Sequence, residues 1–377
     1  MPLKKIIYII SNIDKSLLFE WTVKHLAQSK KIKVSYILLN PGESSFAKLI
    51  RDNGLPLYEI IYSGKKSFFK ALFEVYNILR KQKPDAINTH LFDASLIGII
   101  AGWAACVKTR ILSRHHSTLH HVYHPHAVRY DKIMNRLATK IIVASKMVRD
   151  ILVEKEKVRP SKIEIINHGF MMDDFRNVDS SRIDLLRQKY VLVKNQNAFP
   201  VIGVISRHIH WKGIQYIIPA FKNLLNDYPN AHLILANAKG DYKNEIRKLL
   251  LDIPACCFTE IEYEYDSPAL YKLFDVFVHV PINYHSEAFG QIYIEALAAR
   301  IPCVFTISGI AGDFIEDKKN ALVVPYKDPV KIYEAIKTIL TDENLKRTIV
   351  ENGEKDVLKS FHFNVMAEQL DRLYLQL

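Results

Sequence analysis

The chain alternates short apolar runs with longer segments in which apolar residues recur every three or four positions. In the first half, apolar runs predict β-strands at 5–10, 33–39, 86–88, 109–113, 140–144 and 163–166. Helical spacing lies between them at 17–27, 67–81, 96–106 and 131–138. The second half repeats the order, with strands predicted at 201–206, 232–236, 276–280 and 303–306 and helices at 215–226, 243–251, 293–299, 330–341 and 365–375. This alternation predicts two open α/β sheets of parallel strands.

The length of 377 residues agrees with two domains of ordinary size. A polar segment at 176–200 interrupts the strand–helix alternation and ends in the run Asn-Gln-Asn-Ala-Phe-Pro. We interpret this segment as the region between the domains, and therefore predict domains at 1–180 and 181–360.

Composition excludes several classes of protein. With 49% hydrophobic and 24% charged residues, the chain is neither disordered nor fibrous, and its four cysteines lack the spacing of a zinc ribbon. The longest weakly polar stretch, 94–107, is shorter than the ~20 residues that a membrane span needs. No secretion signal opens the sequence, so we expect a cytoplasmic protein.

Positive charge is concentrated in the first half of the chain. Residues 1–180 hold 29 lysines and arginines against 16 acidic residues, whereas residues 181–377 hold 23 against 24. This asymmetry indicates either a face for an anionic partner or an ordinary solvated surface. The basic and aromatic segment 65–70 is equally compatible with a membrane-surface element and with a helix whose Phe68 and Phe69 lie in the core. No nucleic-acid-binding motif accompanies the charge, so nucleic acid is not expected as a partner.

The most informative stretch for chemistry is a loop and helix start that follow an apolar strand. Glu287 lies in the loop, and Glu295 lies eight residues later, inside the predicted helix. We expect this helix to begin near Phe289 or Gly290, where backbone N–H groups of Gly290 and Gln291 and the helix dipole favour a phosphate. Two carboxylates at this spacing reach different ends of one ligand. Without other evidence, however, two glutamates at this spacing are more often a helix-capping residue and an exposed charge on the helix than a ligand site.

Two cations lie upstream of these carboxylates. The apolar strand at 201–206 ends directly at Arg207, and Lys212 with Gly213 opens the next predicted helix. In an open α/β sheet the carboxyl ends of the strands bind ligands. Arg207 can clamp phosphate oxygens in a bidentate fork and Lys212 adds a mobile point charge, so the pair is suited to a diphosphate.

These residues belong to a set of motifs that runs in order through 140–340. Its members are Ile165 to Phe170, Arg207, Lys212-Gly213, Leu270-Tyr271, Asp275 to Val278, Glu287 to Gln291, Glu295 to Ala298, Pro302, Gly309, Gly312, Glu316, Asn320 and Leu322 to Pro325. The set resembles the retaining glycosyltransferases of family 4. The resemblance implies the GT-B fold, two Rossmann-like doubly wound domains with an interdomain cleft. It also implies that 1–180 binds the acceptor, that 181–360 binds the nucleotide sugar, and that a final helix at about 361–377 packs back on the first domain.

The resemblance also implies roles for single residues of the second domain. Arg207 and Lys212 would bind the donor diphosphate and stabilise the departing nucleoside diphosphate, and Glu295 would hold the ribose hydroxyls. Glu287 would contact the donor sugar near its reacting face, while 289–291 would supply backbone N–H groups. Cationic side chains and the helix dipole then replace a metal ion, so no metal or other cofactor is expected.

In the first domain the resemblance identifies His116, or failing that His115, as a residue that contacts the donor sugar. Ser11 and Asn12 follow the first strand and are candidates for the acceptor side, although their loop lacks the glycines of many relatives. The histidine-rich segment 115–126 also allows a metal site. No carboxylate or cysteine stands within that segment, so we favour a polar loop for its remaining histidines.

Together these features predict a glycosyltransferase that moves a sugar from a nucleotide diphosphate sugar, by default a UDP-sugar, to an acceptor hydroxyl. The basic first half favours a glycan or lipid-linked acceptor, such as a polysaccharide or lipopolysaccharide precursor, held at the anionic inner face of a membrane. Two alternatives stay open at this point. One is a nucleotide-sugar epimerase of the same fold, and the other is a non-catalytic polyanion-binding protein.

Overall fold

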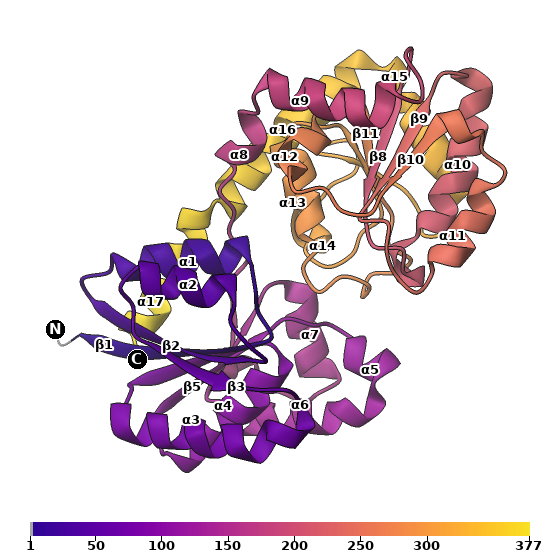
Figure 1. Ribbon diagram of the computed structural model, residues 1–377. Coiled ribbons are helices and arrows are strands. Elements are labelled where there is room, and N and C mark those ends of the chain that lie inside the picture. The colour runs from indigo at the N-terminus through magenta and orange to yellow at the C-terminus, as the bar shows by residue number, and fades with distance from the viewer. Residues whose placement is uncertain (1–2) are drawn as a thin grey trace. The chain divides into compact units, whose positions relative to one another are not determined.

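The computed structural model describes residues 3–377, and the chain divides into two compact units (Figure 1). Unit 1 consists of Met1–Phe170 and Phe363–Leu377, and unit 2 consists of Met171–His362. The boundary after Phe170 lies ten residues before the one that the sequence suggests.

A single parallel sheet organises unit 1. Its strands follow the order β3-β2-β1-β4-β5-β6-β7, and every pair is parallel. The strands are β1 (Lys4–Ser11), β2 (Ile32–Asn40), β3 (Leu57–Ile61), β4 (Ala86–His90), β5 (Thr109–Arg114), β6 (Lys140–Val143) and β7 (Ile163–Ile165). The chain builds outward from β1 to β3 and then returns to β4, so the strand order reverses between β1 and β4. This reversal is the switch point at which doubly wound sheets bind ligands.

Helices cover both faces of this sheet. They are α1 (Leu17–Ala27), α2 (Ser45–Asp52), α3 (Phe68–Gln82), α4 (Phe92–Ala104), α5 (Leu119–Tyr123), α6 (Val128–Leu137), α7 (Lys146–Glu154) and α17 (Phe363–Leu375). Alternate residues of β1 face opposite cores. Ile6 and Tyr8 pack with α1, α2 and α17, while Ile7 and Ile9 pack with α3 and α4. The Tyr8 hydroxyl lies 2.5 Å from that of Tyr374, which ties α17 to unit 1.

Unit 2 repeats the same architecture with a second parallel sheet. Its strand order is β10-β9-β8-β11-β12-β13, with the reversal between β8 and β11. The strands are β8 (Val201–Ile205), β9 (His232–Ala236), β10 (Phe258–Ile261), β11 (Val276–His279), β12 (Cys303–Phe305) and β13 (Leu322–Val323). Its helices are α8 (Asp173–Arg176), α9 (Ser180–Arg187), α10 (Ile214–Asp227), α11 (Lys243–Leu250), α12 (Ser267–Tyr271), α13 (Gln291–Ala298), α14 (Ala311–Phe314), α15 (Pro329–Thr341) and α16 (Glu343–Phe361).

The polar segment 176–200 differs from the expected linker, because it is built into unit 2. Asp179 caps α9 by accepting the backbone N–H of Ser181, and Leu186 of that helix is buried. Arg182 of α9 forms an ion pair with Asp266, the residue that caps α12. A polar composition therefore conceals a helix that docks through one apolar side chain and one ion pair. Among the described residues, no helix has both the length and the apolar character required to span a bilayer.

Candidate active site

The predicted donor residues gather at the strand reversal of unit 2. Arg207 follows β8 by two residues, and the loop that carries Glu287 follows β11, the neighbouring strand. Arg207 is exposed, and no ion pair is formed by its guanidinium within the described part of the chain. A doubly wound sheet is expected to bind its ligand at this position.

Lys212 reaches the loop after β11 because of the glycine that follows it. Lys212 ends a short 3₁₀ turn, and Gly213 adopts a left-handed conformation with φ of 78°. A side chain at Gly213 would place its Cβ 1.8 Å from the carbonyl oxygen of Val280, so only glycine allows this close approach. The lysine is thereby directed at the residues that follow β11.

Glu287 is held by three side chains. Its Oε1 accepts hydrogen bonds from Lys212 Nζ at 2.5 Å and His279 Nε2 at 3.2 Å, and its backbone N–H donates to Ser308 Oγ at 3.0 Å. The Glu287 side chain is only 12% exposed. Burial by itself raises the pKa of this carboxyl, but Lys212 and His279 outweigh burial and lower the pKa to about 2. Glu287 is therefore ionised at neutral pH and is paired with Lys212.

Glu295 has the opposite electrostatic environment. It lies on α13 and accepts hydrogen bonds from Tyr271 Oη at 3.0 Å and Gln291 Nε2 at 2.9 Å. Neither donor is charged, and burial raises the pKa of Glu295 to about 7. The two glutamates of the motif thus differ in pKa by about five units, and only Glu295 titrates near neutral pH.

The start of α13 has the backbone geometry of an anion-binding site. Gly290 precedes the helix with φ of 85°, and the first helical residue is Gln291, one position later than the sequence suggests. Phe289 is buried, and its carbonyl oxygen accepts the N–H of Ile310, which fixes the loop before the helix. The N–H groups of a first helical turn have no partner within their helix and point along the dipole toward a ligand.

Ser11 and Asn12 follow β1 in unit 1 and have different environments. Ser11 is buried, and its Oγ accepts the N–H of Ala94 in the first turn of α4. Asn12 is exposed, adopts a left-handed conformation with φ of 51°, and donates to Asp93. Asparagine tolerates this conformation, so the loop makes its tight turn without the glycine seen in many relatives. Of the two, Asn12 is the residue that reaches the surface.

His115 belongs to a group of neutral histidines below the carboxyl end of the sheet. Its Nε2 lies 3.0 Å from Nδ1 of His90, and its ring is 5.9 Å from that of His168. Burial and the neighbouring His116 lower the pKa of His115 to about 4, and burial lowers the pKa of His168 to about 3. These rings line a small, mainly apolar pocket together with Tyr8 of β1 and residues of α1 and α17.

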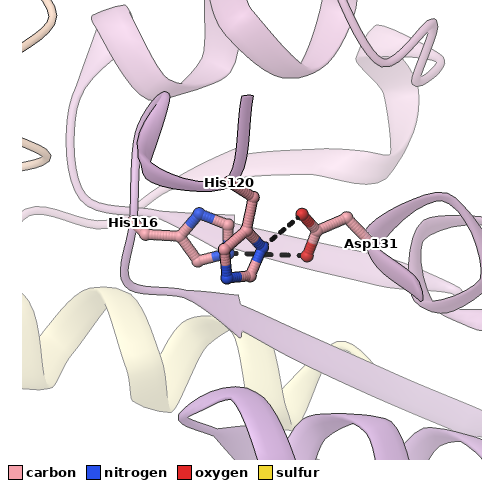
Figure 2. A group of neighbouring side chains, drawn as sticks. All are labelled: His116, His120 and Asp131. Atoms are coloured by element: carbon pink, nitrogen blue, oxygen red, sulfur yellow. Dashed lines mark hydrogen bonds and ion pairs between the residues drawn. The ribbon is translucent and has the colours of Figure 1, made fainter. Parts of the chain in front are cut away.

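His116 contacts a carboxylate that the local sequence does not contain. Asp131 of α6 lies with one oxygen 2.7 Å from Nδ1 of His120 and the other 3.5 Å from Nε2 of His116 (Figure 2). The three groups are close enough to hold a metal ion. However, Arg114 also contacts Asp131, with Nη1 at 2.8 Å from the same oxygen as His116. A guanidinium at this position already supplies the positive charge that an ion would bring.

Comparison with known proteins decides the family. The sequence profile of Glycosyltransferase Family 4 matches residues 22–173, and that of Glycosyl transferases group 1 matches residues 184–356. Together the two profiles cover most of both units. The chain belongs to the family-4 glycosyltransferases. Its two Rossmann-like units have the GT-B fold that the motifs predict, and the reading as a non-catalytic polyanion-binding protein is set aside.

Individual relatives of this glycosyltransferase are distant but cover most of the chain. The capsular polysaccharide biosynthesis glycosyltransferase CapM of Staphylococcus aureus is 27% identical over 82% of this chain and 81% of its own length. The Escherichia coli UDP-Gal:alpha-D-GlcNAc-diphosphoundecaprenol alpha-1,3-galactosyltransferase is 20% identical over 93% of this chain and 94% of its own. Among solved structures, Anabaena HepE in complex with UDP and glucose superposes with a TM-score of 0.83 over the whole of both chains, at 18% identity.

Three residues of the glycosyltransferase were assigned no role from its sequence. His279 is the last residue of the buried strand β11, Tyr271 ends α12, and Asp131 lies in α6. A histidine at the end of an otherwise apolar strand was a usable signal, because strand ends at this edge face the ligand. Asp131 gave no such signal, because its partners precede it by more than ten residues and only the fold brings them together.

Proposed function

We propose that this glycosyltransferase transfers a hexosyl unit from a UDP-sugar to an acceptor hydroxyl, with retention of configuration at the anomeric carbon and without a metal ion. The observation that carries the proposal is the arrangement at the β8–β11 reversal. An ionised glutamate and its lysine lie just before α13, and Arg207, which forms no ion pair among residues 3–377, follows the strand that neighbours β11. That set offers separate groups for a diphosphate and for a sugar.

The proposed step breaks the bond between the anomeric carbon and the diphosphate oxygen and forms a bond from the same carbon to the acceptor oxygen. Arg207 and Lys212 would stabilise the charge that develops on the departing UDP, and the acceptor proton would leave with it. Glu287, ionised and buried, would stabilise positive charge on the sugar. Glu295 would accept hydrogen bonds from the ribose. By the same resemblance His116 would contact the sugar.

Relatives support a UDP-sugar and a lipid-linked or polysaccharide acceptor. The Escherichia coli relative is a UDP-galactose enzyme for a diphosphoundecaprenol-linked sugar, and CapM acts in capsular polysaccharide biosynthesis. HepE was solved with UDP and glucose. The excess of positive charge in residues 1–180, the proposed acceptor-binding part, suits an acceptor that carries negative charge, such as a diphosphate-linked lipid.

A panel of nucleotides and nucleotide sugars tests the proposed donor. We expect UDP to raise the melting temperature more than GDP or ADP, because a ligand that binds only the folded state stabilises it by mass action. Incubation with each UDP-sugar and a membrane lipid extract, followed by NMR, should show release of UDP and a new glycosidic bond. An isomerised sugar nucleotide formed without acceptor would instead identify an epimerase, and stabilisation by none of the nucleotides would contradict the donor assignment.

Chelation provides a separate test of metal independence. We expect turnover of the UDP-sugar to persist in excess EDTA, because Arg207, Lys212 and the start of α13 already place positive potential beside the diphosphate. Initial rates with and without EDTA, each in metal-free buffer, give the comparison. Loss of turnover on chelation that a divalent ion restores would contradict this part of the proposal.

One face of α3 is suited to an anionic membrane. Phe69 is 79% exposed and Phe73 is 65% exposed, one helical turn apart, whereas Phe68 is half-buried and packs on the core. The expectation of a core position therefore holds for Phe68, whereas Phe69 lies outside the core. The three lysines of 65–70 are exposed beside this face. Exposed aromatic residues with adjoining lysines are typical of helices that lie on anionic lipid.

Vesicle binding should follow from this face of α3. We expect sedimentation with phosphatidylglycerol vesicles at low salt and little with phosphatidylcholine, because each cation near an anionic surface contributes about 1 kcal/mol. Replacement of both Phe69 and Phe73 by serine should reduce the bound fraction severalfold. Leu251→Ser, which removes an exposed apolar side chain from unit 2, is the matched control. Equal binding to both lipids would contradict the proposed anionic membrane surface and would show that the positive charge of the first half is an ordinary solvated surface.

A further inference from the structure

A buried charged network lies behind His116 and takes no part in the donor site. Arg114, the last residue of β5, forms ion pairs with Asp131 of α6 at 2.8 Å and with Glu156 at 2.6 Å. The side chains are 2%, 0% and 0% exposed. Two carboxylates against one guanidinium leave one uncompensated negative charge in a buried site, which is costly unless further donors surround it.

Histidines supply those donors, and each carboxylate takes different ones. Asp131 faces His116 and His120, whereas Glu156 accepts from His121 at 3.1 Å and from Asn135 at 2.6 Å. An ionised carboxylate can only accept hydrogen bonds. Nε2 of His116 lies 3.5 Å from the ionised Oδ1 of Asp131, and the negative charge at this distance favours a hydrogen on Nε2 over a lone pair.

The other nitrogen of His116 is then left with a lone pair and no partner. Nδ1 of His116 is buried and has no hydrogen-bond partner among the residues that the structure describes. Burial lowers the pKa of His116, despite the opposing effect of Asp131, so the ring is neutral and Nδ1 is an acceptor. Buried polar atoms are rarely left unpaired in folded proteins, and such an atom is suited to a hydroxyl donor of a bound sugar.

We propose that Asp131 is a positioning residue for His116: it fixes the tautomer with the hydrogen on Nε2 and thereby presents Nδ1 as a hydrogen-bond acceptor to a hydroxyl of the substrate. The proposal rests on the proposed function for the identity of that hydroxyl. The arrangement resembles the way in which a carboxylate orients the histidine of a hydrolase triad. Arg114 affects His116 only indirectly, because its ion pair keeps Asp131 ionised and fixes the position of that carboxylate. This same contact disfavours a metal ion, since a second cation at Asp131 would be repelled by the guanidinium.

The two carboxylates of the network provide a matched pair of variants. Asp131→Asn and Glu156→Gln each remove one negative charge next to Arg114 from an equally buried site, but only the first touches His116. Asparagine carries no charge, so it no longer favours a hydrogen on Nε2 as strongly as the carboxylate does, and Nδ1 is presented as an acceptor in a smaller fraction of the molecules. We expect both variants to lose stability, and only Asp131→Asn to lower kcat for UDP-sugar turnover, by at least tenfold relative to Glu156→Gln at equal folded fraction.

The tautomer is measured directly by long-range ¹H–¹⁵N NMR on protein labelled at histidine nitrogens, with His116→Gln used to assign the signals. Wild-type protein should show the Nε2–H form of His116, and Glu156→Gln should retain it. A wild-type ring protonated at Nδ1 would overturn the proposal, even if Asp131→Asn fails to fold. So would equal kcat losses in the two variants, or Zn²⁺ that stabilises wild type but not Asp131→Asn. If His116→Gln keeps full turnover, the substrate does not use Nδ1 and this proposal fails, whereas the donor assignment, which rests on residues of unit 2, is unaffected.

Discussion

Replacement of Lys212 by methionine is expected to lower kcat/KM for the UDP-sugar by about 100-fold or more, the size of effect seen when one group that stabilises transition-state charge is removed. Two losses combine in this variant. The departing diphosphate loses a cation, and Glu287 loses the partner that lies 2.5 Å away. Without Lys212, burial is opposed only by His279, so the pKa of Glu287 should rise from its value of about 2. Steady-state kinetics and UDP calorimetry measure the two effects.

A surface lysine of the same unit serves as the control for Lys212→Met. Lys222 of α10 forms an ion pair with Asp252 in which both side chains are more than half exposed. Exposed pairs of this kind contribute little, so Lys222→Met should keep wild-type turnover. Lys212→Met should also unfold at a lower denaturant concentration, because it leaves Glu287 buried with a weaker partner. Wild-type kcat/KM in Lys212→Met would show that the donor site has been placed wrongly.

The affinity of the protein for UDP is expected to rise with pH through neutrality because of Glu295. Burial raises the pKa of this carboxyl to about 7, so below that pH it is largely protonated and accepts hydrogen bonds poorly. If the carboxylate holds the ribose hydroxyls, affinity should rise by up to tenfold per unit from about pH 5.5 to 7 and level off above pH 8. Calorimetry across this range gives the profile.

Glu295→Gln separates this titration from that of the phosphate of UDP itself. The variant should bind UDP more weakly at pH 8 and should lack the part of the profile that Glu295 contributes. A difference between wild type and variant that is independent of pH would contradict the ribose assignment.

The free energy of unfolding should fall as pH rises, in contrast to the affinity for UDP, which should increase. The pKa of Glu295 is higher in the folded protein than in the unfolded chain. The contribution of this carboxyl to the free energy of unfolding is therefore full below about pH 4.5 and is lost as pH rises through about 7. Urea unfolding should therefore show Glu295→Gln gaining on wild type between about pH 5 and pH 8.

The alternation of strands and helices was predictable wherever an element was strongly periodic. The strand at 232–236 and the helix at 330–341 were located to within one residue, as β9 and α15. Short elements were missed, including β3, β10 and β13, because a run of two to five residues at a sheet edge carries too little pattern. The helix α9 was taken for part of a linker, because its stability comes from a cap and an ion pair rather than from an apolar stripe.

The candidate donor site was predictable as a set of residues but not as a set of pKa values. The spacing of Arg207, Lys212, Glu287 and Glu295 placed all four near one edge of a sheet. Which glutamate is ionised depends on neighbours from elsewhere in the chain, namely Lys212 and His279 for Glu287 and neutral donors for Glu295. Burial acts on both carboxyls in the same direction, so only the contacts made on folding separate them.

By itself, the sequence determined two doubly wound sheets and the order of the motifs, since periodicity and spacing are local properties of the chain. The resemblance of those motifs to known glycosyltransferases indicated the family. Only the tertiary structure decided which charges meet. Asp131 joins His116 because α6 packs beside the end of β5, and Lys212 meets Glu287 because Gly213 lets the backbone approach Val280. Electrostatic effects decay with distance and grow with burial, so they depend on contacts between residues far apart in the chain.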